Sequence, residues 1–369
     1  MNKESGSDRQ SGQMHTGYDL ESGMLSRARE WTDLFPWFRL VRTLRVAGSP
    51  VTVGLVALTF VVWFNVHGWI VGDAIVDSQS RPPRVTGPAP DSLTVAVTRI
   101  SDCIRQMFLI PMIDAAVLKK NWFSSFLAIG WSLVIWMPTT LYLVRQGALL
   151  TAGRDLVGIE SGIRRSIRIT PQAWLVAIVP LICILLFGSI IFGLGWLFAL
   201  TAYAPWLRWP LLFGVAMVAI PCGILGFGAS VAVPLGWAAI ANEQDPDALD
   251  SLSRGYEYLY RRPLKVIWYC VLSVGILVVI VSIALAITHV GETIAIAMLA
   301  LASVSEEQIG ILHYLPVVVG LTLIWALLGG VYLLLRFDAG EQEVEDLWQP
   351  SPKPKPPLPQ LPSSLGTNR

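Results

Sequence analysis

Three histidines near the predicted outer ends of apolar segments are the residues best suited to metal chemistry. They are His67, His289 and His313, with Glu292, Glu306 and Glu307 close to the last two in the sequence. Neutral imidazole is a common ligand of zinc, copper and haem iron. The spacing of the three matches no local metal-binding motif, and a single histidine at a membrane interface is usually an amphipathic anchor. We therefore predict no bound metal and no cofactor, with these histidines as the candidate ligands of an alternative metal or haem site.

The sequence contains no pattern of a known catalytic centre. The GxSxG, HExxH, GxGxxG and P-loop motifs are absent. Ion-coupled transporters and proton relays hold ionisable groups inside their membrane helices, whereas the six apolar segments of this chain contain no Asp, Glu, Lys or Arg. Asn65 is a polar residue deep in the first segment, where asparagine usually bonds to a neighbouring helix. We predict that the protein is not an enzyme and has no catalytic residues.

Arginines gather before the first, third and fifth apolar segments, and a proline follows each group. The three stretches read RLVRTLRVAGSP, SGIRRSIRITP and SLSRGYEYLYRRP. Basic residues near the cytoplasmic surface attract anionic lipid, at about 1 kcal/mol for each Lys or Arg. We predict that nine arginines face lipid headgroups: Arg39, Arg42, Arg45, Arg164, Arg165, Arg168, Arg254, Arg261 and Arg262.

The elements that would position these residues are membrane helices. Of the 369 residues, 54% are apolar and 14% charged, and the mean hydropathy is +0.58. A bilayer core needs about 20 apolar residues of helix, and six stretches qualify: 51–72, 126–144, 173–200, 211–241, 266–290 and 314–335. The fold class is therefore an all-α, polytopic membrane protein. Pro221 and Pro234 predict a tilt or kink in the fourth span, or alternatively a break into two short segments.

The distribution of basic residues predicts the orientation. The loop after the second span holds five arginines and the loop after the fourth holds four basic residues, whereas the loops after the third and fifth spans hold one between them. By the positive-inside rule both termini are cytoplasmic. The long loop at 73–122 is predicted to lie outside, with an amphipathic helix around Leu93, Val97 and Ile100.

The repeated basic stretches predict three similar units, each with a basic interfacial helix followed by a hairpin of two spans. In the third unit, Asp245 is the expected N-cap, Pro246 the first helical residue and Pro263 the turn into the membrane. Leu252 and Leu259 share the apolar face of this helix with Leu249 and Tyr256, and that face is expected to rest on lipid. The predicted units are a disordered cytoplasmic tail at 1–30, hairpins at 31–145, 146–241 and 242–336, and a disordered proline-rich cytoplasmic tail at 337–369.

The segment AIANEQDPDALDSLSRGYEYLYRRPLKVIWY resembles a pattern in uncharacterised bacterial polytopic membrane proteins. More distantly it is similar to the membrane domain attached to some glycerophosphodiester phosphodiesterases. Those enzymes owe catalysis to a separate barrel domain, and no segment here is long enough to supply one. The resemblance implies a fold and a bacterial cytoplasmic (inner) membrane location, without an activity.

Two functions fit these observations. The preferred hypothesis is a non-enzymatic multi-pass scaffold, assembly or lipid-interacting factor, whose partners are anionic lipids of the cytoplasmic face and other membrane proteins. The alternative is a channel or permease component for a neutral or lipidic substrate. A formal net charge of +1 and the lack of a basic patch with interleaved aromatics argue against a nucleic-acid partner.

Overall fold

The chain folds into helices, six of which are long and apolar enough to cross a membrane. The computed structural model describes residues 35–71, 93–108, 115–198, 204–301, 314–340, 344, 347 and 348. The α-helices are α2 (Leu44–Ala47), α3 (Pro50–Val71), α4 (Leu93–Phe108), α5 (Ala115–Thr151), α6 (Ile159–Leu197), α7 (Arg208–Asn242), α8 (Ala248–Arg261), α9 (Pro263–Leu301) and α10 (Leu315–Asp338). Two 3-10 helices, η1 (Pro36–Thr43) and η4 (Pro205–Leu207), precede α2 and α7. The prediction of an all-α protein with six apolar helices is confirmed, whereas residues 1–30 and most of 337–369 lie outside the described residues.

The fourth span is a single helix. α7 runs without interruption through Pro221 and Pro234, so the alternative of two short segments is wrong. A proline removes one backbone hydrogen bond, and membrane helices tolerate this loss because nearby groups compensate for it. α6 is likewise continuous through Pro171 and Pro180. The second basic stretch is therefore the first part of a long helix and not a separate interfacial helix.

The third basic stretch is a separate helix, although it begins two residues later than expected. Asp247, and not Asp245, is the N-cap of α8, where its carboxylate accepts a 3.3 Å hydrogen bond from the amide of Leu249. Asp247 has extended backbone angles that direct its side chain back to the first turn. α8 ends at Arg261 and α9 begins at Pro263, as the sequence predicts.

The buried face of α8 packs against protein. An ideal Cβ on Gly255 would lie 2.4 Å from the carbonyl oxygen of Ala232 in α7, so the two helices touch through their backbones. Leu252 and Leu259 are buried there, whereas Leu249 is 59% exposed. The apolar face is thus rotated from the predicted one because glycine permits close approach to α7.

The core forms around α10, which packs chiefly against α5 and α9 and also contacts α3 and η1. Two glycines bring α10 and α5 into direct contact. A Cβ on Gly147 would lie 1.8 Å from the carbonyl oxygen of Ala326, and one on Gly329 would lie 1.9 Å from that of Val144. α4 also joins this core, because Ile100 packs over Gly320.

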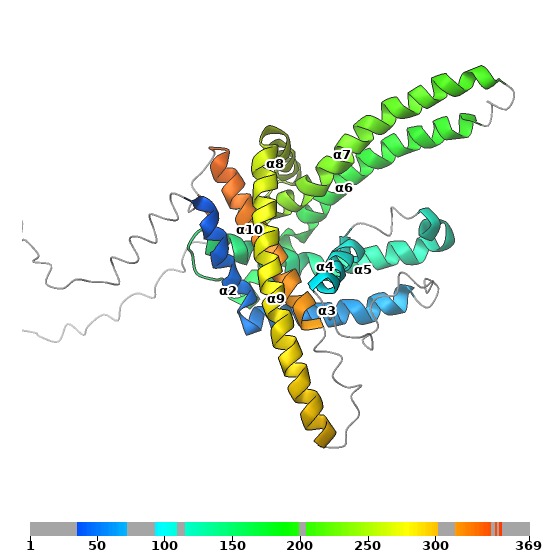
Figure 1. Cartoon of the computed structure of the whole chain (residues 1–369). Helices are drawn as coiled ribbons and strands as arrows, with labels where there is room; N and C mark the ends of the chain where they lie inside the picture. Colours follow the sequence, from blue (N-terminus) through cyan, green and yellow to red (C-terminus); the bar gives the residue numbers. More distant parts are fainter. Residues whose placement is uncertain are drawn as a thin grey trace, which may run out of the picture.

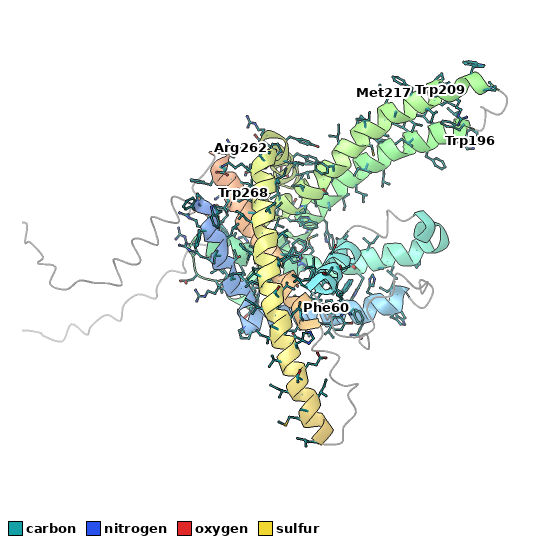
Figure 2. The ribbon with its side chains drawn as sticks, in the orientation of Figure 1. Phe60, Trp196, Trp209, Met217, Arg262 and Trp268 are labelled. Atoms are coloured by element: carbon teal, nitrogen blue, oxygen red, sulfur yellow. The ribbon has the colours of Figure 1, made fainter. Side chains whose placement is uncertain are left out.

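The α6–α7 pair extends from this core as an arm (Figure 1). The two helices pack along each other, and their outer halves expose large apolar side chains. Trp196 and Trp209 are 76% and 77% exposed near the tip, and Met217 lies on the arm between the tip and the core (Figure 2). The later part of α9 extends in another direction. The spans converge at the ends near α2 and α8. At the other ends the arm and α9 point away from each other (Figure 1), whereas α3, α5 and α10 stay in contact through the Trp63–Ser132 hydrogen bond and the Phe60–Tyr314 ring pair.

Candidate functional site

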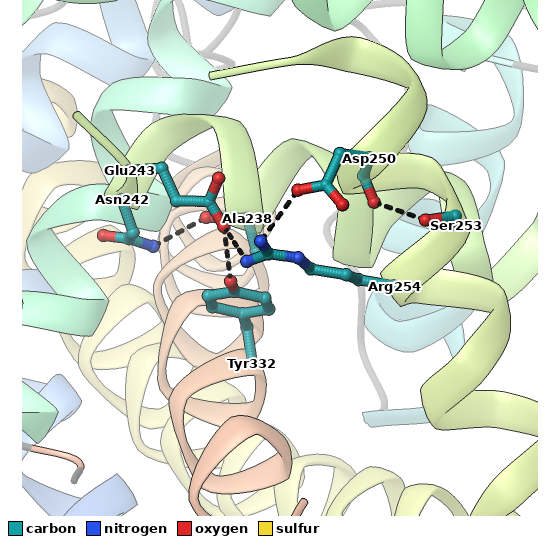
Figure 3. Close-up of polar contacts among 7 residues, drawn as sticks. All are labelled: Ala238, Asn242, Glu243, Asp250, Ser253, Arg254 and Tyr332. Carbon is teal, nitrogen blue, oxygen red and sulfur yellow. Dashed lines mark hydrogen bonds and ion pairs between the residues drawn. The ribbon is translucent and has the colours of Figure 1, made fainter. Parts of the chain in front are cut away.

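The helix ends predicted to be cytoplasmic are joined by polar side chains, and Glu243 is the main junction. It directly follows α7, and its Oε1 accepts a 2.6 Å hydrogen bond from Arg254 of α8 and a 3.3 Å hydrogen bond from the hydroxyl of Tyr332 in α10 (Figure 3). Arg254 also forms a 2.7 Å ion pair with Asp250, one turn earlier in α8. The carboxylate of Glu243 therefore links three helices. We call Glu243, Asp250, Arg254 and Tyr332 the polar junction.

Burial and charge act in opposite directions on the carboxyl of Glu243. Burial disfavours its ionised form and raises its pKa, while the positive charge of Arg254 and the hydrogen bond from Tyr332 reduce the rise. Burial alone would lower the pKa of Arg254, but Glu243 and Asp250 together raise it above its ordinary value. The guanidinium therefore stays charged. This arrangement suits a structural link, because Arg254 has a carboxylate on either side of it.

A second cluster, which we call the tryptophan clamp, joins the C-terminal segment to α5, α6 and α7. Arg145 of α5 is only 5% exposed. It donates a 3.0 Å hydrogen bond to the carbonyl of Ala241 and a 2.8 Å hydrogen bond to that of Trp348. Arg165 of α6 lies 4.1 Å from the centroid of the Trp348 ring and donates to the carbonyl of Glu243 at 2.6 Å. The clamp combines cation–π contacts with hydrogen bonds to two chain segments.

A third link holds α9 to α10. Asp338 accepts a 2.8 Å hydrogen bond from the hydroxyl of Tyr269 and forms a 3.0 Å ion pair with Lys265. Each of these three clusters lies at the ends where the helices converge. Their shared effect is to fix the relative positions of the spans at one end of the molecule.

The nine predicted lipid-facing arginines occupy different environments. Arg165 and Arg254 have the protein partners described above. Arg164 and Arg261 are exposed and pair with glutamates one turn away, Arg164 with Glu160 at 2.9 Å. Arg39 is partly buried. The other four are exposed: Arg42, Arg45, Arg168 and Arg262.

The structure does not gather the candidate metal ligands. No group of three His, Cys, Asp or Glu side chains suited to a metal occurs among the described residues. His67 is partly buried and stacks 4.9 Å from the ring of Trp63, whereas His289 is exposed on α9. His313 lies outside the described part of the chain.

Sequence reasoning missed the roles of Arg145, Glu243 and Trp348. Arg145 was placed in a loop after the second span, although the next residues, Gln146–Thr151, continue α5. The apolar run Ala148–Leu150 was the available signal for that continuation. Trp348 lies about 200 residues from its partner Arg145, so no local pattern connects them.

Comparison of the chain with protein-family models, with curated proteins and with solved structures finds no match.

Proposed function

We propose that this multi-pass membrane protein is a non-enzymatic scaffold that holds other membrane proteins together. The observation that carries the proposal is the apolar surface of the α6–α7 arm. Phe192, Phe213 and Phe227 are exposed along it, and the part of the helix pair that projects from the core offers a large lateral surface in the bilayer. Packing, and not hydrophobicity alone, drives association of helices in lipid.

The links at the converging ends support this function. The polar junction and the tryptophan clamp fix the base of the arm, so its surface is presented in a defined position. We further propose that the base faces the cytoplasm and that the chain forms three units, each a basic stretch followed by two spans. Contacts between consecutive spans, α3 with α5, α6 with α7 and α9 with α10, support the three units.

Crosslinking from the arm tests the scaffold. A photo-crosslinking amino acid at Met217, exposed on the arm, should yield a discrete adduct with another membrane protein that also co-purifies at a fixed stoichiometry. The same amino acid at Ile240, which is buried in the same helix, serves as the control and should yield none. A monomer that purifies alone and moves a solute across vesicle membranes would contradict the scaffold.

The second candidate function is a channel or permease component for a neutral or lipidic substrate. Pro221 favours it, because proline has no amide hydrogen and the carbonyl of Met217 loses its intrahelical donor. A water-filled path beside α7 would satisfy that oxygen. Single cysteines from Gly214 to Gly236, probed with a membrane-impermeant thiol reagent, would label periodically along such a path and would remain unlabelled if lipid or protein covers α7.

A further inference from the structure

The segment before the first span has three distinct edges. η1 is a 3-10 helix of eight residues, and in this geometry side chains three positions apart lie above one another. Leu40, Thr43 and Val46, the last already in α2, are each 0% exposed. This edge packs against α5 and α10. The period of three in the sequence thus matches the period of the helix.

The two remaining edges are basic and apolar. Arg39, Arg42 and Arg45 follow one edge, and Phe35, Phe38 and Val41 follow the other, where all three apolar side chains are exposed. Exposed aromatic and aliphatic groups beside arginines are typical of a segment at the membrane interface, where the apolar groups enter the acyl region and the charges stay at headgroup depth. We therefore expect the edge that contains Val41 to face lipid.

A pocket of about 510 Å³ opens between this segment and the end of α5. Its volume lies within the range of ligand-binding pockets. Val41 and Leu150 form apolar parts of its wall. Three arginines and one acidic residue supply its charge: Arg42, Arg45, Arg154 and Asp155. Arg42 and Arg45 alone outnumber the carboxylate of Asp155, so the pocket wall carries a net positive charge.

The last turn of α5 is closed by backbone hydrogen bonds. Gly153 has a φ of +72°, which closes the last turn of the helix. The amide of Arg154 then donates to the carbonyl of Leu149 at 2.8 Å, and that of Gly153 to the carbonyl of Leu150 at 3.0 Å. The guanidinium groups of Arg42 and Arg45 make no hydrogen bond or ion pair with any residue that the structure describes. Their donors remain available to a ligand.

We propose that this pocket binds a phosphate oxyanion, supplied by the headgroup of an anionic phospholipid. Arginine suits the ligand because its planar donors match phosphate oxygens in pairs. The exposed edge of Phe38 and Val41 places acyl chains beside the pocket. The proposal rests on the membrane location of the chain and is independent of the scaffold function.

Lipid binding by the full-length protein tests the site. Delipidated protein in detergent at 0.15 M salt is titrated with phosphatidylglycerol, with phosphatidylcholine or with inorganic phosphate, and the Tm is followed. Phosphatidylglycerol should raise the Tm saturably and phosphatidylcholine should not. The Arg42→Gln, Arg45→Gln double variant should bind phosphatidylglycerol about 30-fold more weakly, the loss expected for two arginine–phosphate contacts. An unchanged Tm without lipid shows that this variant is folded.

The matched control removes two arginines outside the pocket. Arg261→Gln, Arg262→Gln has the same charge change at the end of α8, where the sequence also predicts contact with headgroups. It should keep the affinity within about threefold, because Arg261 already pairs with Glu257, neither residue lines the pocket, and salt screens distant charges. Equal weakening in both double variants would overturn the proposal, as would a wild-type protein with no saturable response to either probe. A saturable response to inorganic phosphate alone, lost in the Arg42→Gln, Arg45→Gln variant, would support the oxyanion site and assign its ligand to the aqueous phase. Co-purification of partners is measured separately, so failure of the lipid site leaves the scaffold test unaffected.

Discussion

At the residue scale, Glu243 gives the protein a pH-dependent term in its stability. Burial raises the pKa of this carboxyl against the influence of Arg254, so the folded chain holds the proton to a higher pH than the unfolded chain does. The contribution of this group to stability is therefore fully present below its ordinary pKa near 4.5 and falls as the pH rises through the folded value. The stability advantage of wild type over Glu243→Gln should decrease from pH 4 upward.

Thermal denaturation in detergent across pH 4–7 measures this difference. The control is Asp245→Asn, which removes an exposed carboxyl two residues away, and the Glu243→Gln difference is compared with that of this variant at each pH. A constant difference between wild type and Glu243→Gln would show that burial does not dominate this carboxyl.

The contact between α5 and α10 also depends on single residues. Replacing Gly147 with alanine would place a methyl group 1.8 Å from the carbonyl oxygen of Ala326. The helices must separate to admit it, and we expect a loss of about 1–3 kcal/mol or more. Gly130→Ala lies in the same helix with nothing within 4 Å of its new methyl group, and it should be neutral or stabilising by up to about 1 kcal/mol. Unfolding in denaturant measures both, and equal stability would contradict the packing.

At the element scale, the helices that the sequence predicted well are those set by local composition. Each span contains a run of about 20 or more apolar residues, so its existence follows from local composition. Its length does not, because α6, α7 and α9 have 39, 35 and 39 residues. Pro171 misled the prediction of a separate helix, and Pro221 misled only the alternative of a broken fourth span. A proline disfavours a helix interior locally, while the surrounding apolar run favours continuation in lipid. The rotation of α8 was not predictable, because it follows from the contact of Gly255 with Ala232, which belongs to another helix.

The candidate site was predictable only in part for the same reason. The basic stretches predict charged helix ends. They do not predict the partner of Glu243, because Tyr332 lies 89 positions away in the chain. Arg145 and Arg165 meet at Trp348 through tertiary contacts alone. Periodicity identifies the face of a helix and not the partner that covers it.

The start of α8 provides a test at the same scale. Asp247→Ala removes the side-chain acceptor at the N-cap and should cost about 1 kcal/mol. It should also increase hydrogen exchange at the first amides of α8. Asp245→Ala, two residues earlier and outside the cap, should leave that exchange unchanged. Greater exchange in the Asp245 variant than in the Asp247 variant would show that Asp245 is the N-cap, as the sequence alone predicts.

At the scale of the whole molecule, the three clusters of polar links lie at the ends where the spans converge. The α6–α7 arm and the later part of α9 leave the base in different directions (Figure 1), so the links at the base must hold those directions. The polar junction joins the end of α7 to α8 and α10, the tryptophan clamp joins α5 and α6 to the C-terminal segment, and Asp338 joins α10 to α9. Loss of one link should therefore loosen one part of the base and leave the other spans in place.

The tryptophan clamp makes this testable by truncation. A chain ending at Glu343 lacks Trp348 and also the buried side chains of Val344 and Leu347, which leaves the Nη2 of Arg145 buried without its acceptor. An unpaired buried donor of this kind costs about 1–3 kcal/mol or more, so the Tm should fall. A chain ending at Pro350 removes residues 351–369 and keeps the peptide carbonyl of Trp348 and the other clamp contacts that the structure describes, so its Tm should match wild type. If the two truncated chains have the same Tm, the clamp does not stabilise the base. If only the shorter chain has a lower Tm, and limited proteolysis cuts that chain between α5 and α6, the C-terminal segment is an integral part of the helix bundle.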